Sequence, residues 1–142
     1  MVDAVEAGDL MQRLVLMGTA GLPDAGHDRV QRAAVKIMVD ERDPPSPDAL
    51  GVAIADAHTN GRSVALHCVT RVELVVACAA LEQAGALPTD RIEHASVATD
   101  EMIATLSALG VTVVTQPGLV HDRGDRYPVS YTHLTLPTIC SV

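Results

Sequence analysis

The sequence predicts an α/β fold in the form of an incomplete (β/α)₈-type barrel, covering about strands three to seven. Short apolar runs rich in β-branched residues recur along the chain, and segments with helix-capping signals lie between them. The runs are almost continuously apolar, which is typical of parallel strands covered on both faces. Strand followed by helix, four times over, is the pattern of a β/α repeat. The predicted strands are residues 13–17, 35–39, 64–68, 91–94 and 111–115.

Three helices are predicted from residues that typically begin and end helices. The first has Ser46 as N-cap and Pro47 at its first position, and it stops at Asn60-Gly61. The second opens with Thr70 and Glu73 at capping-box spacing and closes at Gly85.

The third helix begins with Thr99, followed by two acids, and ends before Gly110. All three carry apolar residues at helical spacing, so each is expected to pack one face against the strands.

Two histidines favour a barrel over a doubly wound sheet. His67 and His94 each end a predicted strand, and in a barrel the reactive groups lie at the carboxyl ends of several strands. A dinucleotide-binding sheet needs a glycine-rich fingerprint, which residues 18–21 imitate only weakly. Two strand-end imidazoles that meet over one cavity are most often held together by a divalent metal. The alternative for each histidine alone is a hydrogen-bonded residue of the core or rim.

Composition argues against several classes of partner. The net charge is −8, basic residues occur singly, and aromatic residues make up 1% of the chain, so a nucleic-acid surface has no support. No apolar stretch approaches the ~20 residues of a membrane helix, and the start of the chain does not resemble a signal peptide. Three cysteines without a CxxC pair argue against a disulfide framework. We therefore expect a cytoplasmic protein that binds neither nucleic acid nor membrane.

Three segments together resemble a known family. They are AVKIMVDE (residues 34–41), VALHCVTR (64–71) and DRIEHASVATDEMIATLSALGVTVVTQP (90–117). They look like the amidohydrolase superfamily of metal-dependent hydrolases, specifically the third amidohydrolase family, which includes N-substituted formamide deformylase. The resemblance runs from about Leu10 to Tyr127, and its most specific part begins at RIEHA.

The resemblance implies a site and a reaction. Lys36, His67 and His94 would bind one or two divalent ions, with zinc expected, and Lys36 would be carbamylated. Metal-activated water would then hydrolyse an amide-like carbon–nitrogen bond of a small molecule. Lys36 lies early in its predicted strand, so its side chain would have to reach toward the barrel mouth. Gln116 and Arg71 are candidate substrate contacts.

The chain also departs from the family pattern. It has no His-x-His pair, no eighth-strand aspartate, and Thr70-Arg71 where many relatives carry Gly-Asp. No catalytic residue set is therefore complete. We expect a fragment that needs the missing barrel halves to fold and is inactive alone. Two alternatives stay open: a non-catalytic barrel remnant or interaction module, and a barrel phosphoesterase acting through the same histidines.

A change of composition divides the chain near its end. All charged side chains lie before residue 127, and VSYTHLTLPT within residues 128–142 resembles a translated sequencing adapter. We expect a partial amidohydrolase barrel over residues 1–127 and a foreign tail over residues 128–142. His133 and Cys140 would then have no biological role.

Overall fold

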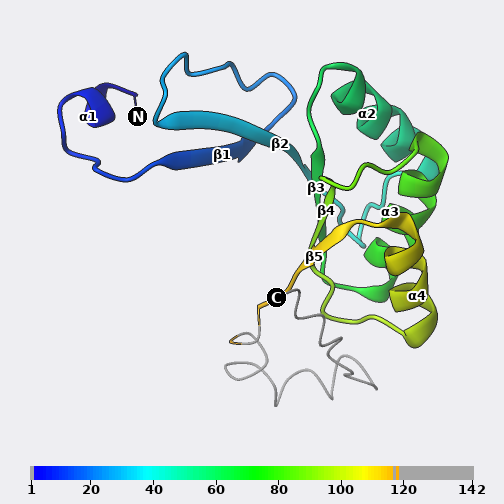
Figure 1. The fold of residues 1–142 in the computed structure, drawn as a ribbon. Coiled ribbons are helices and arrows are strands. Elements are labelled where there is room, and N and C mark those ends of the chain that lie inside the picture. Colours follow the sequence, from blue (N-terminus) through cyan, green and yellow to red (C-terminus); the bar gives the residue numbers. More distant parts are fainter. Residues whose placement is uncertain (1, 117, 119–142) are drawn as a thin grey trace.

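The computed structural model describes residues 2–116 and 118 (Figure 1). Within them, five strands and four helices follow one another as α1 (Val2–Glu6), β1 (Leu14–Gly18), β2 (Val30–Met38), α2 (Pro47–Thr59), β3 (Val64–Cys68), α3 (Arg71–Ala84), β4 (Arg91–His94), α4 (Asp100–Leu109) and β5 (Thr112–Val114).

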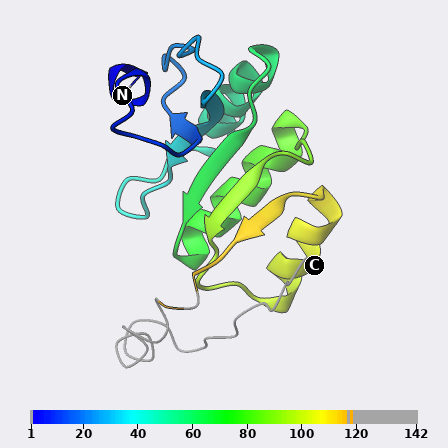
Figure 2. The same cartoon turned by 60° about the vertical axis from the view of Figure 1, so that its left-hand side comes forward.

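The strands form one parallel sheet whose order follows the sequence, β1-β2-β3-β4-β5. This order lacks the reversal that defines a doubly wound sheet, and it is the order of strands around a barrel. Helices α2, α3 and α4 all lie on one face of the sheet (Figures 1 and 2). The α/β prediction is confirmed. Among the described residues the helices cover one face, and the opposite face includes the fully buried Ala65 of β3.

The core lies between the sheet and this helical layer. Leu66 of β3, Ile92 of β4 and Leu74 of α3 are fully buried in one apolar cluster. Burial of each such side chain stabilises the fold by about 1.5–3 kcal/mol. The alternate positions of the strands face away from the helices, and they carry the polar side chains considered below.

The predicted helix ends are confirmed. Ser46 Oγ accepts a hydrogen bond from the Ala49 amide, and Thr99 Oγ1 accepts one from Met102. Thr70 and Glu73 form the complete capping box that their spacing predicts. These local interactions fix where each helix begins, and therefore where the loop after each preceding strand must end.

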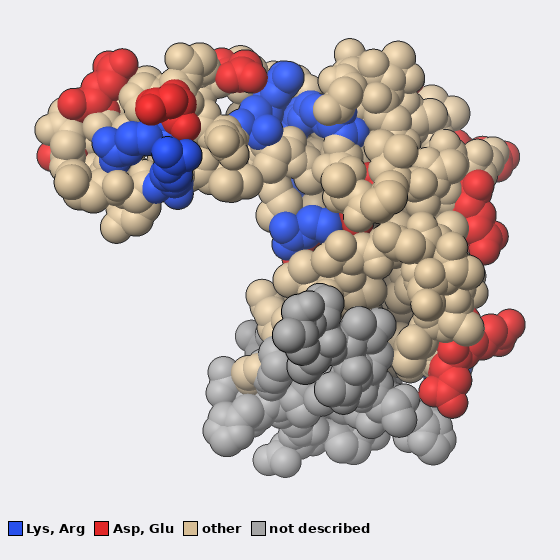
Figure 3. Space-filling view, viewed as in Figure 1, with Lys and Arg blue, Asp and Glu red and all other residues tan. Residues whose placement is uncertain are grey.

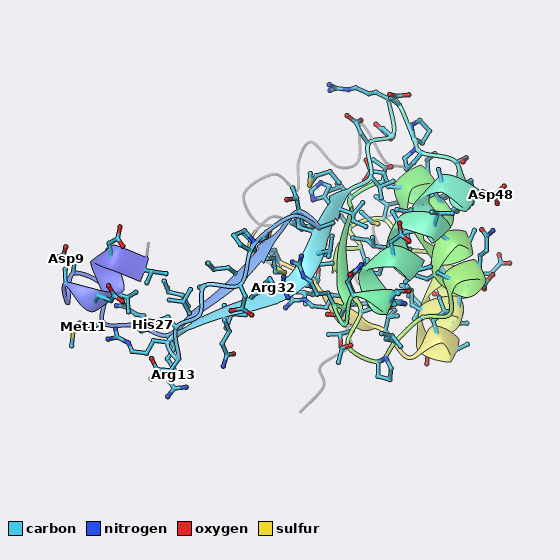
Figure 4. All side chains as sticks on the ribbon, turned by 90° about the horizontal axis from the view of Figure 1, so that it is seen from above. Asp9, Met11, Arg13, His27, Arg32 and Asp48 are labelled. Carbon is cyan, nitrogen blue, oxygen red and sulfur yellow. The ribbon has the colours of Figure 1, made fainter. Side chains whose placement is uncertain are left out.

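The N-terminal part of the chain differs from the prediction. Residues 19–29, between β1 and β2, contain no helix, so only three strand–helix units occur among the described residues. Residues 2–34, here called the arm, project away from the layered part, residues 35–114, here called the body. In Figure 4, Met11, Arg13 and His27 lie at the far end of the arm, and Asp48 marks the helical side of the body.

Strand β2 also begins five residues earlier than predicted, at Val30 instead of Val35. Its first half pairs with β1 and its last part with β3, which makes it the link between arm and body. Lys36 therefore lies late in its strand. The expectation that it lies early, far from the carboxyl end, is wrong.

No helix within residues 2–116 is long and apolar enough to cross a membrane. The proposed tail, residues 128–142, lies outside the described residues, as do His133 and Cys140, so that division of the chain stays a prediction.

Candidate metal centre

His67 lies on the sheet face opposite the helices. Its neighbours Leu66 and Cys68 point into the apolar core, so the alternation along β3 turns the imidazole to the other side. Cys68 is accordingly a packing residue of the core. Burial raises the pKa of its thiol, and the nearby Glu73 charge raises it further, which keeps the sulfur protonated.

His94 reaches the same face by a turn in its backbone. It is the last residue of β4 and the register partner of Cys68, so regular alternation would direct it toward the helices with Ile92. Instead His94 and Ala95 have positive φ values of 78° and 46°. Few non-glycine residues adopt this conformation, and it often marks a functional site. The ring of His94 meets that of His67 edge to face, with the centroids 4.7 Å apart and the planes at 75°.

The surroundings of His67 favour the neutral form of its imidazole. Burial lowers the pKa of the imidazole, and the charges of His94 and Lys36 lower it further, whereas Glu73 and Glu93 oppose the shift in part. A neutral imidazole has a free ring nitrogen lone pair, which is the form that binds a metal. Electrostatics and geometry thus both favour a ligand role for His67.

Lys36 stands on the neighbouring strand, on the same sheet face as His67. Its register partner is Ala65, and Met38, two residues further on, is the partner of His67. The structure thus brings the three predicted metal-binding residues onto one face of three adjacent strands.

An open cavity of about 370 Å³ lies beside His67. It is bounded by the ends of β2 and β3 and by the loops that follow them. Its lining residues are Met38, Val39, Asp40, Glu41, Arg42, His67, Val69, Thr70 and Glu73. The predicted substrate contacts Arg71 and Gln116 are both exposed, and neither lines this cavity. A second cavity, of about 310 Å³, lies between α3 and α4 on the outer side, away from the histidines.

The donor set fits a divalent metal in part. Two imidazoles converge, and Lys36 can add an oxygen donor only if its amine is carbamylated. Among residues 2–116, no three His, Cys, Asp or Glu side chains cluster closely enough to hold an ion by themselves. In particular, Glu93, the register partner of His67, pairs with Arg91 instead, with Glu93 Oε1 2.9 Å from Arg91 Nη2.

The other described histidines have different roles. His58 lies in the last turn of α2 and contacts the fully buried Asp90, with Nε2 3.0 Å from Oδ2. Asp90 in turn accepts hydrogen bonds from the amides of Val64 and Leu87. His27 lies on the arm and accepts a hydrogen bond from the amide of Arg29. Neither belongs to the candidate centre.

Charge is distributed unevenly around the fold (Figure 3). Acidic side chains line the outer edge of the helical layer, acidic and basic side chains both lie on the arm, and further basic side chains lie where the arm meets the body. At that junction the buried Arg62 donates hydrogen bonds to four carbonyl groups, those of Thr19, Ala20, Ala33 and Ala34. Sequence reasoning missed this residue, since nothing local marks an arginine that binds carbonyls about 30 to 40 residues away.

Comparison with solved structures finds two similar proteins. One is an uncharacterized metal-dependent hydrolase from Pyrococcus furiosus, with a TM-score of 0.71 and 23% identity over 90% of this chain and 33% of that one. The other, from Pyrococcus horikoshii OT3 and described in the same words, has a TM-score of 0.62 and 26% identity over 77% of this chain and 26% of that one.

No family model and no curated protein matches the chain. The chain spans about a third and about a quarter of the two solved chains. These comparisons show that the described residues adopt the fold of part of a metal-dependent hydrolase.

Proposed function

We propose that the chain is part of a (β/α)₈-barrel hydrolase that uses a divalent metal, zinc, to cleave amide-like carbon–nitrogen bonds of small molecules. Strands β1 to β5 would be strands three to seven of that barrel. Lys36, His67 and His94 would hold the metal. The activity of the whole protein is part of this proposal, since the chain spans only a fraction of the solved hydrolases that it resembles.

The observation that carries the proposal is the contact between His67 and His94 at the carboxyl ends of adjacent parallel strands. Zinc–imidazole bonds of about 2.0–2.1 Å and tetrahedral angles place the centres of two imidazole rings about 5 Å apart. The observed separation is 4.7 Å. A turn with positive φ at His94 is needed to reach this arrangement, and its backbone strain is more readily understood if the ring has a ligand.

The residues at the metal site would have different roles. His67 and His94 would supply neutral nitrogen donors that leave the ion most of its charge. Lys36, on the next strand, would add a carbamate oxygen after its neutral amine attacks carbon dioxide and releases a proton to solvent. When bound, the ion would activate water and polarise the scissile carbonyl. The cavity beside His67 would receive the substrate, with Met38 as an exposed apolar contact.

Zinc binding by the 142-residue chain tests the proposal. The unaltered chain should bind zinc. His67→Ala or His94→Ala should weaken binding at least about tenfold, because each removes a side chain that binds the ion directly. His27→Ala is the matched control, because this histidine lies on the arm and should leave affinity unchanged. Lys36→Ala should abolish any gain in affinity caused by added bicarbonate. Equal zinc affinity in all four variants would contradict the proposed site.

A complete protein that contains this chain and binds no zinc would instead favour the alternative of a non-catalytic barrel remnant. The alternative of a phosphoesterase is tested by assaying the complete protein on amides and on phosphate esters. Cleavage of phosphate esters without cleavage of amides would contradict the amide assignment.

A further inference from the structure

Glu73 has an environment that helix capping alone does not explain. Its side chain is 6% exposed, yet no cationic side chain pairs with it within the described part of the chain. Three backbone amides hold the carboxylate instead. Oε2 accepts hydrogen bonds from Val69 (2.6 Å) and Thr70 (3.0 Å), and Oε1 accepts one from Glu41 (3.2 Å). The capping box accounts for the bond from Thr70, and the bond from Glu41 is outside it.

The bond from Glu41 joins the loop after β2 to the first turn of α3, 32 residues further along the sequence. Glu41 belongs to residues 40–43, here called the rim turn, which follows β2 and borders the cavity beside His67. The turn is held internally, because the amides of Arg42 and Asp43 both bond to Asp40. Among the described residues, the bond from Glu41 to Glu73 is the hydrogen bond that ties the rim turn to another element.

The other oxygen of Glu73 acts on the strand end that carries His67. Val69 and Thr70 follow β3 directly, and their amides are fixed on Oε2. One carboxylate therefore spans the two sides of the cavity, with the rim turn on Oε1 and the end of β3 on Oε2.

We propose that Glu73 is a positioning residue that clamps the rim turn to the end of β3 and so sets the opening of the cavity beside His67. Its relevance to substrate rests on the proposed function, whereas the clamp itself does not. A carboxylate suits this role because both of its oxygens accept hydrogen bonds. A charge-assisted bond is also stronger than one between neutral groups.

Glu73→Gln separates the clamp from the helix cap. The amide oxygen of glutamine can replace Oε2, since glutamine also serves in a capping box. Its NH₂ group would then face the Glu41 amide, donor against donor, and the rim turn would be released. Glu82→Gln is the matched control, because it removes one negative charge from an exposed position on the same helix.

Amide hydrogen exchange and the rate of histidine modification measure whether the rim turn is released, and neither requires a metal. In Glu73→Gln the Glu41 amide should exchange at least about tenfold faster, while the Val69 and Thr70 amides keep their protection. Diethyl pyrocarbonate, at a pH where the imidazoles are neutral, should modify His67 several-fold faster and His27 at an unchanged rate. General destabilisation would accelerate the exchange of the buried Leu66 amide as well, and that result would overturn the proposal.

A second variant covers the case in which glutamine disrupts folding. Glu73→Asp keeps the charge on a side chain one methylene shorter, so it can cap the helix but cannot also reach Glu41. It should release the Glu41 amide to a similar extent, and unchanged exchange at Glu41 in both variants would overturn the clamp. Zinc titration of the same variants tests the other proposal separately. A chain that shows the exchange pattern but binds no zinc retains the clamp and loses the metal site.

Discussion

Both the body and the arm contain strands formed by apolar, β-branched runs, but helices cover these strands only in the body. In the body, β3 is buried at four of its five residues and β4 at its two central residues, and both strands contribute to the core beneath the helical layer. In the arm, β1 has a strict alternation of half-buried and exposed residues, and Val15 is 65% exposed. The connection from β1 to β2 contains no helix that would cover the strand. An apolar β-branched run therefore predicts a strand in both regions, but not whether that strand is covered.

The difference has an energetic consequence. Stability should reside in the body, where apolar area is removed from water. In the arm, β1 should depend on its pairing with β2 and on the hydrogen bonds that Arg62 makes where the arm meets the body.

Replacing a leucine by alanine should give the largest difference between body and arm in the free energy of unfolding. Leu66→Ala removes a fully buried side chain from the centre of the sheet and should lower the free energy of unfolding by about 3–5 kcal/mol. Leu16→Ala, in half-buried β1, should cost less than about 1 kcal/mol. Denaturant unfolding of both variants measures the difference. Equal losses would show that arm and body share one core.

A buried carboxylate in the body should have the next largest effect. Asp90→Ala leaves the amides of Val64 and Leu87 without their acceptor and should cost about 2–3 kcal/mol. The control is Asp24→Ala in the arm, where an exposed carboxylate accepts one bond from Gly26 and should matter by less than about 0.5 kcal/mol. If the two aspartates proved equivalent in thermal or denaturant unfolding, Asp90 would not be the link between α2, β3 and β4 that its contacts indicate.

Arg62→Lys should have a smaller effect on overall stability than Leu66→Ala or Asp90→Ala, and its effect should be the most local one. Lysine keeps the charge but lacks the fork of donors that reaches four carbonyl groups. We expect a loss of about 1 kcal/mol. Hydrogen exchange should show faster exchange at Leu14 and Leu16 and unchanged exchange at Leu66. A uniform increase across the body would argue against a junction that serves the arm.

The sequence predicts the body well because its signals are local. Ser46, Thr70 and Thr99 mark the helix starts by bonds that span three residues, and alternation along β3 correctly separates His67 from Cys68. The approach of His94 to His67 also agrees with the expectation from matched strand ends.

The remaining features depend on partners that are distant in sequence. Arg62 binds the Ala33 carbonyl 29 positions away, and the Glu41–Glu73 bond joins residues 32 positions apart. The positive φ at His94 is a further example, because regular alternation assigns that side chain to the wrong face. No periodicity in the chain encodes these contacts.

The most direct test of the central claim is X-ray absorption of the zinc-loaded chain, which counts the imidazoles bound to the ion. The account predicts two imidazole nitrogens at about 2.0 Å in the unaltered chain, one in His67→Ala and one in His94→Ala. A spectrum without imidazole scattering, or one that neither substitution changes, would contradict it.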